Sequence, residues 1–337
     1  MLNIALLGCG RIGRMHADLI DRHPNCQLAV VYDPVPAAAM AIAEVTKAEV
    51  AETPDDIFNS DKIDAVIVAS VTSTHANFIE RAVAARKPVL CEKPIDLNID
   101  RVRACRAKIA GSNVLVQLGF NRRFDPGHGG MKAAIDAGDI GNLLQVLITS
   151  RDPEPPSDEY LTGAGGMLRD MTIHDFDLAR FILGQDEPVE VFAYAAPLID
   201  PVRGARLKEV DCAMIVMKSA NGRQVFINNA RQAPYGYDQR LEAHGELGMV
   251  QSTNRTPHGV QTFTAAGTGN AAPLEPFFIE RYAQAFKHQL DAFVGAVVQN
   301  TPPKVGFDDG MRALLLAEAA YASLEKGCAV AVAAIDD

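Results

Sequence analysis

The fold of this chain is decided by the stretch Asn3–Gly13, whose sequence is Asn-Ile-Ala-Leu-Leu-Gly-Cys-Gly-Arg-Ile-Gly. A short apolar run ends in a G-x-G-x-x-G turn, and an amphipathic stretch follows it. Glycines at these spacings permit a tight turn, a close approach of backbone N–H groups to a pyrophosphate, and close packing of the helix on the strand. The motif predicts a strand–turn–helix unit that holds a dinucleotide through Gly8, Gly10, Arg11, Ile12 and Gly13.

An acidic residue lies at the distance that such a motif requires. Asp33 follows a second apolar run, Gln27–Tyr32, and comes 33 − 13 = 20 residues after Gly13. A carboxylate there accepts hydrogen bonds from ribose hydroxyls and repels a 2′-phosphate. The next residues are Pro-Val-Pro, so no adjacent arginine offers a partner to a phosphate. We therefore predict NAD rather than NADP; the alternative is that Asp33 merely begins a turn.

Strand-like and helical segments alternate through the first 120 residues. Apolar runs at 65–69, 88–92 and 114–119 predict further strands, and the segments between them have helical periodicity. The runs are nearly continuous in Val, Ile, Leu and Ala, as expected for strands that helices cover on both faces. The pattern predicts an α/β domain over residues 1–120, a doubly wound parallel sheet of the Rossmann type.

The pattern changes after residue 120. Shorter strand-like segments follow, with the hairpin dipeptide Asn221-Gly222 between two of them, and helical periods return at 172–183, 278–299 and 310–326. The segments predicted as strands are 143–150, 189–194, 211–217, 224–229, 238–244 and 249–252. We expect a second domain over residues 121–337, α+β in character, with a mostly antiparallel sheet.

Composition excludes several classes of protein. Lys plus Arg minus Asp plus Glu is 32 − 42, a net charge of −10, which disfavours a nucleic-acid binder. No apolar run is long enough to span a bilayer, and no secretion signal is evident at the start. Six cysteines are scattered without a C-x-x-C pair, which predicts reduced thiols without a zinc cluster or disulfide frame. We expect a cytoplasmic enzyme that binds neither nucleic acid nor membrane.

A lysine follows the fourth predicted strand, in Cys91-Glu92-Lys93-Pro94. In an open parallel sheet, ligands bind outside the carboxyl ends of the strands, so Lys93 is aimed at the cofactor. A partly desolvated lysine there suits proton transfer or a hydrogen bond to a substrate hydroxyl. On position alone, a solvated lysine before a strand-ending proline is an equal alternative.

The stretch Arg169–Asp177 combines carboxylates with a histidine. Thr172 and Asp175 resemble a capping box, with Asp in place of Glu or Gln. On the helix that it would begin, His174 and Asp177 share one face, and Asp170 can reach back towards His174. A histidine oriented by a carboxylate is suited to take a proton from an alcohol.

Two alternatives remain for this stretch. Asp170 could instead bind free N–H groups at the helix start, with His174 as an ordinary buried residue. A metal held by His174, Asp170 and Asp177 is a weaker alternative, because no second histidine or cysteine set lies near them in the sequence. We predict no metal.

Four other residues are weaker candidates for contacts with a substrate. Arg122 follows the last parallel strand and could bind polar substrate groups or form an ion pair in a domain linker. Asp152 begins a proline-rich loop that could form the rim of a substrate site. Tyr235 and Tyr237, in Pro-Tyr-Gly-Tyr-Asp, could donate phenolic hydrogen bonds, although aromatic residues are common in turns.

Together these motifs resemble the Gfo/Idh/MocA oxidoreductase family, in particular its inositol-oxidising members. The matching stretches are GCGRIGRMHA, THANFIERAVAARKPVLCEKP, GFNRRFDPG, MTIHDFDLARFILG, YGYDQRLEAHGELGMV and RYAQAFKHQLDAFV. The resemblance implies a Rossmann domain followed by a domain whose large open sheet faces the active site and often supports a homotetramer. It also implies NAD-dependent oxidation of a secondary hydroxyl of a cyclic polyol, such as myo-inositol or scyllo-inositol, or of a similar pyranose.

The resemblance also assigns roles. Lys93, Asp170 and His174 fall on the catalytic positions, with the imidazole as base. Further cofactor contacts fall on Ser70, His75, Glu92 and Lys93, and contacts to the polyol fall on Lys93, Arg122, Asp152, Asp170, His174, Asp177 and one of Tyr235 and Tyr237.

Two points stay open. Inositol-oxidising members often have Asn in an R-N-P stretch where this chain has Arg151-Asp152-Pro153, so the preferred isomer is undecided. The rival functions are an NAD-dependent sugar or glycoside-processing enzyme and a non-catalytic NAD-sensing regulator.

Overall fold

A computed structural model describes residues 1–336, which form two compact units. The first unit contains Met1–Phe120 and Lys287–Arg312, and the second contains Asn121–Phe286 and the residues from Ala313 onwards. The sequence pattern predicts a second domain that takes in the whole of 121–337. The segment 287–312 instead packs with the first unit, for a reason given below.

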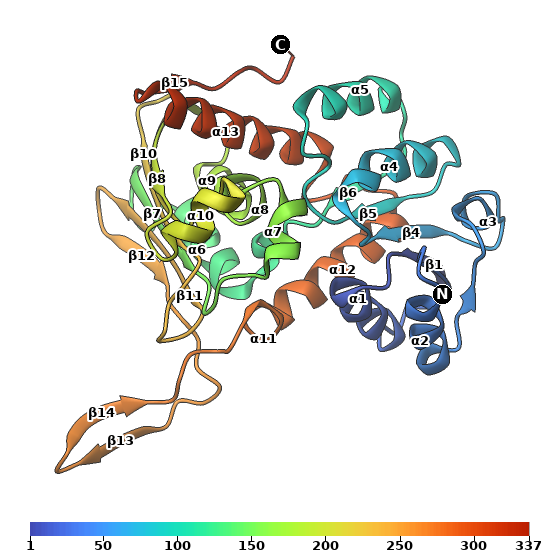
Figure 1. The fold of residues 1–337 in the computed structure, drawn as a ribbon, viewed down its shortest axis with the longest axis horizontal. Coiled ribbons are helices and arrows are strands. Elements are labelled where there is room, and N and C mark those ends of the chain that lie inside the picture. The colour runs from blue at the N-terminus through green and yellow to red at the C-terminus, as the bar shows by residue number, and fades with distance from the viewer. Residues whose placement is uncertain (337) are drawn as a thin grey trace. The chain divides into compact units, whose positions relative to one another are not determined.

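A six-stranded parallel sheet forms the centre of the first unit (Figure 1). Its order, β3-β2-β1-β4-β5-β6, confirms the predicted doubly wound topology. The order reverses between β1 and β4, which places the binding crevice of such folds at the carboxyl ends of these strands. The strands are β1 (Leu2–Leu7), β2 (Cys26–Tyr32), β3 (Glu49–Val50), β4 (Ala65–Val68), β5 (Val89–Cys91) and β6 (Val116–Leu118).

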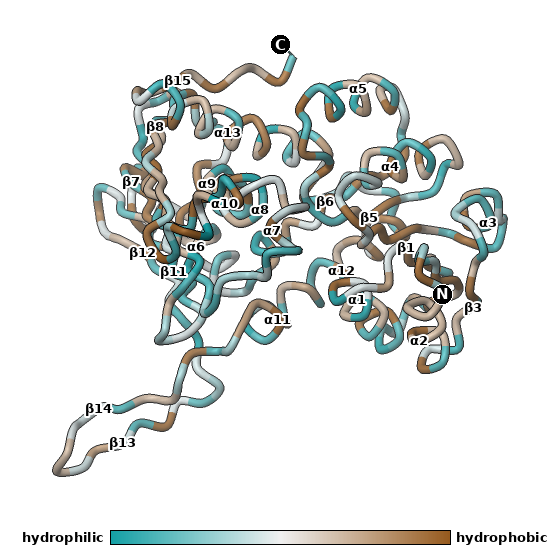
Figure 2. The backbone as a smooth tube through the Cα atoms, in the orientation of Figure 1, coloured by the Kyte–Doolittle hydropathy of each residue, from teal (hydrophilic) through white to brown (hydrophobic). Residues whose placement is uncertain are grey.

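Helices cover this sheet and complete its core. Figure 2 shows apolar backbone along its central strands, and β4 is fully buried. Leu290, Phe293 and Val294 of α12 (Ala283–Gln299) belong to the same apolar cluster as Ile4 and Leu6, which explains why 287–312 lies with this unit. The other helical segments are α1 (Arg11–Asp21), α2 (Pro36–Thr46), α3 (Pro54–Phe58), η1 (Thr72–Thr74), α4 (His75–Ala84) and α5 (Ile99–Ile109).

A seven-stranded mixed sheet, in the order β12-β11-β7-β10-β9-β8-β15, forms the second unit. Only β7 and β10 pair in parallel, so the prediction of a mostly antiparallel sheet is confirmed. The strands are β7 (Leu143–Arg151), β8 (Pro188–Ala196), β9 (Cys212–Ser219), β10 (Gln224–Ala230), β11 (Asp238–Gly245), β12 (Met249–Ser252) and β15 (Val330–Ala331).

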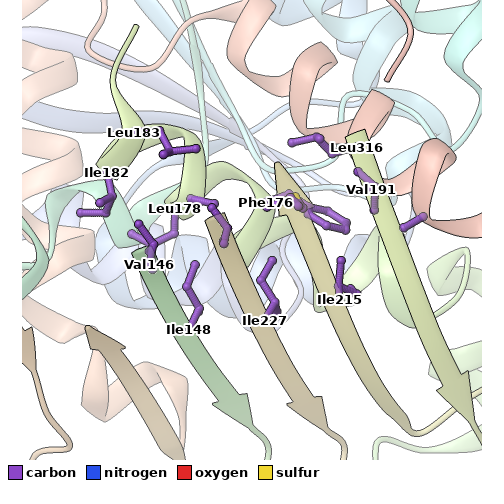
Figure 3. Packing of buried hydrophobic residues seen from close by; sticks show 14 of the residues in the cluster. Val146, Ile148, Phe176, Leu178, Ile182, Leu183, Val191, Ile215, Ile227 and Leu316 are labelled. Carbon is purple, nitrogen blue, oxygen red and sulfur yellow. The ribbon is translucent and has the colours of Figure 1, made fainter. Parts of the chain in front are cut away.

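One face of this sheet carries the core of the second unit. Phe176 and Leu178 of α9 pack over Ile148, Ile215 and Ile227 of the strands (Figure 3). Successive residues of a strand point to opposite faces, so the neighbours of these buried residues, such as Met214 and Val216, are exposed. The other helical segments are η2 (Asn121–Phe124), α6 (Pro126–Ala137), α7 (Asp158–Ala164), α8 (Met167–Asp170), α9 (Ile173–Leu183), α10 (Pro201–Leu207), α11 (Phe278–Arg281) and α13 (Phe307–Lys326).

A two-stranded arm, β13 (Gln261–Thr264) and β14 (Gly267–Ala271), extends from the second unit (Figure 1). The sequence analysis did not predict it, because its strands lack the apolar alternation of a half-buried sheet. All six cysteines are free thiols. Within residues 1–336, no helix combines the length and apolar character needed to cross a bilayer, and no three His, Cys, Asp or Glu side chains cluster as metal ligands would.

Candidate active site

The glycine-rich turn joins β1 to α1 and depends on its glycines in two different ways. Gly8 has a φ of +100°, and a Cβ there would lie 2.4 Å from the backbone N of Ser70. A Cβ at Gly13 would lie 2.0 Å from the Gly8 carbonyl oxygen. At Gly10, by contrast, no heavy atom lies within 4 Å of the Cβ position. Gly8 therefore lets the turn pack against the backbone at Ser70, and Gly13 lets α1 pack against Gly8, whereas Gly10 faces open space.

This turn fits the pyrophosphate of a dinucleotide. Gly10 is the N-cap of α1, and no side chain caps that end of the helix. The first N–H groups of a helix lack partners within it and carry a partial positive charge, which favours an anion. An anion can approach because the space beside Gly10 is open.

Asp33 is fixed beside the turn by two backbone donors. Its Oδ2 accepts a hydrogen bond from the backbone N of Cys9 at 2.8 Å, and its Oδ1 accepts one from the backbone N of Val35 at 2.8 Å. The second bond is the turn that the sequence analysis considered as the alternative. A carboxylate has about four acceptor positions, so capacity remains for ribose hydroxyls. Asp33 can therefore both begin the turn and accept hydrogen bonds from a ribose.

A buried histidine connects the loop after β4 with the turn after β5. His75 is 2% exposed; its Nδ1 lies 2.7 Å from the carbonyl oxygen of Pro94 and its Nε2 lies 2.9 Å from that of Ser70. Burial lowers the pKa of His75, and a neutral imidazole donates to only one of these oxygens. Because both of its ring nitrogens lie against backbone oxygens, His75 holds the loop that contains Ser70 next to the turn after β5. We therefore expect it to support cofactor binding without touching the cofactor.

Glu92 and Lys93 lie at the carboxyl end of β5, where the sequence analysis placed them. Glu92 Oε1 lies 2.8 Å from Nε2 of His16, which is on α1. A Cβ at Gly119 would lie 2.6 Å from Glu92 Oε2, so the Glu92 side chain fills the space above that glycine. Lys93 is half-buried, and the peptide bond that follows it, to Pro94, is cis.

In the second unit, a pair of glycines places the Asp170 segment. Gly165 and Gly166 have φ of +77° and +87°, and a Cβ at Gly166 would lie 2.2 Å from the hydroxyl of Tyr321. The short helix α8 follows them and ends at Asp170, which is 8% exposed. His174 lies one residue into α9 and is half-buried. Both predicted catalytic residues of this unit thus follow a turn that only glycine suits.

The predicted capping box at Thr172 and Asp175 is wrong. The Thr172 side chain makes no cap bond; its Oγ1 donates to Asn229 Oδ1 at 2.7 Å. Asp175 is fully buried, and its Oδ1 accepts from Arg122 Nη1 at 2.5 Å and from Ser150 Oγ at 2.6 Å. Buried donors from η2 and β7 outcompete the local helix cap for this carboxylate.

Arg122 is held by this network at the start of the second unit. Its Nη1 also donates to Ser150 Oγ at 2.9 Å, and its guanidinium lies over the ring of Tyr282 at 5.5 Å. The side chain is only 5% exposed, so any contact with a ligand would come from the few atoms that reach the surface. Arg122 forms an ion pair with Asp175, which matches the alternative of an ion pair in a domain linker.

Asp177 has a different environment from the one predicted. It is fully buried and accepts two hydrogen bonds from Arg123, from Nε at 2.8 Å and from Nη2 at 2.6 Å. The Arg123 guanidinium in turn lies over the ring of Phe181. A carboxylate with both oxygens engaged in a buried bidentate pair is poorly suited to bind a polyol. Its burial argues against the predicted contact with substrate.

The two tyrosines of the YGYD stretch differ sharply. The Tyr235 ring is 52% exposed, and its hydroxyl accepts from Arg151 Nη1 and donates to Asp238 Oδ2, both at 2.7 Å. Tyr237 is 4% exposed and packs edge-on against two aromatic rings, and its hydroxyl donates to no residue among 1–336. Burial raises the pKa of Tyr237 well above its usual value, so this phenol stays a donor. Tyr237 is thus the better candidate for a hydroxyl ligand.

Asp152 interacts electrostatically with the charged side chains of Arg231, Asp170 and Arg122. Its backbone N donates to the Ala230 carbonyl oxygen at 2.9 Å, which extends the pairing of β7 with β10 by one residue. Burial raises the pKa of Asp152 to about 6; Arg231 opposes this effect and Asp170 adds to it. Asp152 is therefore a carboxylate at neutral pH that gains a proton under mildly acidic conditions.

Sequence reasoning missed two residues that contact Asp170. Tyr160 donates its hydroxyl to Asp170 Oδ1 at 2.7 Å, and Arg231 Nη1 donates to Asp170 Oδ2 at 3.1 Å. Tyr160 lies on the short helix α7, in a stretch whose sequence reads as a polar loop, and Arg231 directly follows the strand β10. A buried arginine at a strand end is a weak signal that its partner is a functional carboxylate, and nothing in the sequence identified that partner.

Comparison with known proteins agrees with this arrangement. The model of the oxidoreductase family with an NAD-binding Rossmann fold, Gfo/Idh/MocA, matches residues 2–120, and that of the Gfo/Idh/MocA C-terminal domain matches residues 129–251. The inositol 2-dehydrogenase of Rhizobium meliloti (strain 1021) is 42% identical over 332 residues, which are 98% of this chain and 99% of that protein.

Two solved structures are also similar. The myo-inositol dehydrogenase of Corynebacterium glutamicum ATCC 13032 has a TM-score of 0.95 and 42% identity, and the match covers 99% of each chain. The scyllo-inositol dehydrogenase of Lactobacillus casei, with bound NAD(H) and scyllo-inositol, has a TM-score of 0.92 and 30% identity over 99% of this chain and 100% of that chain. This chain therefore belongs to the Gfo/Idh/MocA oxidoreductase family, as an NAD-dependent, inositol 2-dehydrogenase-like enzyme that acts on CH–OH groups.

Proposed function

We propose that this enzyme oxidises one secondary hydroxyl of an inositol, myo-inositol or scyllo-inositol, to the ketone. One observation carries the proposal: this chain matches an inositol 2-dehydrogenase over almost its full length. Its sequence also contains Lys93, Asp170 and His174, the residues that the family resemblance makes catalytic. The scyllo-inositol dehydrogenase with 30% identity supports a cyclic polyol as substrate.

The first unit would hold NAD and the second would present the polyol. Gly8, Gly10, Arg11, Ile12 and Gly13 would hold the pyrophosphate at the start of α1, and Asp33 would accept from the ribose hydroxyls and disfavour NADP. Ser70, Glu92 and Lys93 would line the crevice at the ends of β4 and β5. When bound, NAD supplies the acceptor for the hydride.

The chain's own residues would handle the proton. His174 would take the proton from the reacting hydroxyl, and Asp170 would orient the imidazole and stabilise its positive charge. Lys93 would donate a hydrogen bond to the same oxygen as negative charge develops on it. Arg122, Asp152 and Tyr237 would bind the remaining hydroxyls and fix which carbon reacts.

The proposal is tested with the purified full-length enzyme, a panel of inositol isomers and pyranoses, and either NAD or NADP. Formation of NADH, followed by absorbance, should be fastest with myo-inositol or scyllo-inositol and much slower with NADP. Faster turnover of a pyranose would contradict the proposed substrate class. Release of an aglycone from a glycoside without net NADH would instead indicate a glycoside-processing enzyme.

Asp152 gives this site a pH dependence that substitution should remove. In the Asp152→Asn variant, we expect the KM for inositol to rise about 10-fold at pH 8, because an amide accepts a hydrogen bond from a hydroxyl more weakly than a carboxylate. In the unaltered enzyme, KM should rise as the pH falls through about 6, where Asp152 gains its proton. Initial rates from pH 5 to pH 8 measure both effects.

The same substitution should affect stability in the opposite direction. The pKa of Asp152 in the folded protein, about 6, lies above the usual value of 3.8, so the ionised form is penalised by folding. This penalty is absent below the usual pKa, grows between the two values, and is complete above pH 6. Asp152→Asn should therefore raise the Tm by roughly 2–4 °C at pH 8 and hardly at all at pH 4. The exposed Asp61→Asn is the matched control, and equal Tm changes for both variants would contradict the assignment.

We also propose that copies of this chain assemble into a homotetramer through the open face of the seven-stranded sheet. Leu147, Tyr194, Met214 and Val216 are all exposed on strands of that sheet. A contiguous apolar surface of this kind is typical of a subunit interface. Light scattering should give four times the chain mass, and Val216→Lys should shift it to smaller species.

A further inference from the structure

We propose that Tyr160 and Arg231 are positioning residues, which grip the two oxygens of Asp170 and thereby set the basicity of His174. The inference rests on the proposed function, because it assumes that His174 takes the proton of the substrate and that Asp170 orients His174. Neither residue belongs to the motifs that resemble the family, and both act through Asp170 rather than on the substrate.

The two donors approach Asp170 from different parts of the second unit. The Tyr160 hydroxyl, on α7, donates to Oδ1 at 2.7 Å, and Arg231 Nη1, just after β10, donates to Oδ2 at 3.1 Å. One oxygen thus receives a neutral donor and the other a charged donor. A carboxylate held at both oxygens cannot rotate without losing a hydrogen bond, so its orientation is fixed.

The backbone that carries Tyr160 is itself anchored. Asp158 begins α7 and accepts from Arg203 Nε at 2.6 Å and from Arg206 Nη2 at 2.5 Å, and both arginines lie on α10. Arg203 also donates to the carbonyl oxygen of Pro156. Although the Tyr160 ring is 45% exposed, its hydroxyl is therefore presented to Asp170 by a segment fastened at its start.

Arg231 is a buried cation surrounded by carboxylates. It is 2% exposed, and its Nε and Nη2 have no hydrogen-bond partner among residues 1–336. Its positive charge opposes the rise in pKa of both Asp152 and Glu209, whereas the charge of Asp170 adds to that rise. Tyr160 and Arg231 bond to Asp170, and the charge of Asp170 acts on Asp152 and Glu209. His174 follows four residues after Asp170, on α9.

This arrangement has a definite effect on His174. Hydrogen bonds from Tyr160 and Arg231 stabilise the negative charge of Asp170, so this carboxylate stabilises a protonated imidazole less than a carboxylate without these donors would. The proton affinity of the imidazole falls as a result. His174 would then stay unprotonated, and able to accept a proton, down to a lower pH than it would if Asp170 lacked these two hydrogen bonds.

The test uses the full-length enzyme with Tyr160→Phe and Arg231→Gln, and with Thr262→Val as the control for loss of an exposed hydroxyl. The acidic limb of the pH profile of kcat for inositol, measured at saturating substrate so that the effect of Asp152 on KM does not enter, reports the protonation of the base in the enzyme–substrate complex. We expect its midpoint to move to higher pH by about 0.5–1 in Tyr160→Phe and by about 1 or more in Arg231→Gln. Thr262→Val should leave the profile unchanged.

A second measurement does not depend on turnover. The rate at which diethylpyrocarbonate modifies His174, followed by peptide mass spectrometry across the pH range, reports the protonation of that imidazole directly. The same upward shift is expected. If Arg231→Gln fails to fold, as a buried change can, Tyr160→Phe still decides the matter, because it removes one oxygen atom.

The outcomes separate the two proposals. Lower kcat with an unchanged midpoint in both measurements would show that Tyr160 only supports the fold, and would overturn the inference. If no inositol is oxidised but the modification midpoint still shifts, the grip on Asp170 stands and the proposed substrate fails. A shift in both measurements supports both proposals.

Discussion

Replacing His174 with glutamine is expected to lower kcat for inositol oxidation about 1000-fold, because general-base catalysis contributes about 10²–10⁴-fold. Glutamine is polar and similar in size but cannot take a proton at neutral pH. The affinity for NADH should stay within about twofold, because the residues proposed to hold the cofactor lie in the other unit. Steady-state NADH formation and a fluorescence titration with NADH measure the two quantities.

The exposed His244→Gln serves as the matched control and should retain full turnover. Lys93→Met should lower kcat by a similar factor to His174→Gln, because both side chains are proposed to act on the same oxygen. Near-normal turnover in His174→Gln would show that another group takes the proton. A large loss of NADH binding would show instead that the substitution disturbs more than the proton transfer.

The second large effect is expected in the glycine-rich turn, where two similar substitutions should fail for different reasons. Gly13→Ala places a Cβ 2.0 Å from the Gly8 carbonyl oxygen, so the backbone must shift. We expect the free energy of unfolding to fall by about 3 kcal/mol or more. Thermal unfolding, followed by circular dichroism without cofactor, measures this loss.

Gly10→Ala meets no atom within 4 Å and should fold with a loss of about 1 kcal/mol or less. Its methyl group would occupy the space proposed for the pyrophosphate, so the Kd for NADH should rise at least about 10-fold. Gly130→Ala, within α6 and with nothing near its Cβ position, is the control for both. Tight NADH binding by Gly10→Ala would place the pyrophosphate elsewhere.

The sequence was most informative where structure is local. The apolar run of β1, the glycine spacing and the distance to Asp33 are properties of one strand–turn–helix unit. Together with the alternation of apolar runs and helical periods through residue 120, they predicted the doubly wound sheet of the first unit, although not its edge strand β3. The alternation in β9 likewise predicts a strand with one buried face. The resemblance then added the identity of the polar residues that follow these strands.

Long-range competition limited the prediction elsewhere. Thr172 and Asp175 have the spacing of a helix cap, yet Asn229 takes the first and Arg122 and Ser150 take the second. Partners from distant strands cannot be inferred from spacing. The position of 287–312 is a similar case, because its helical periodicity does not reveal which core its apolar face joins.

The double hydrogen bonding of Asp33 has a consequence for redesign of the coenzyme preference. The carboxylate that would discriminate against a 2′-phosphate also secures the backbone of Cys9 inside the glycine-rich turn. Exchanging it for an arginine to recruit NADP would release that turn and so weaken the grip on either coenzyme. A successful switch needs a small acceptor such as serine at this position, with the cationic residue introduced further along the loop.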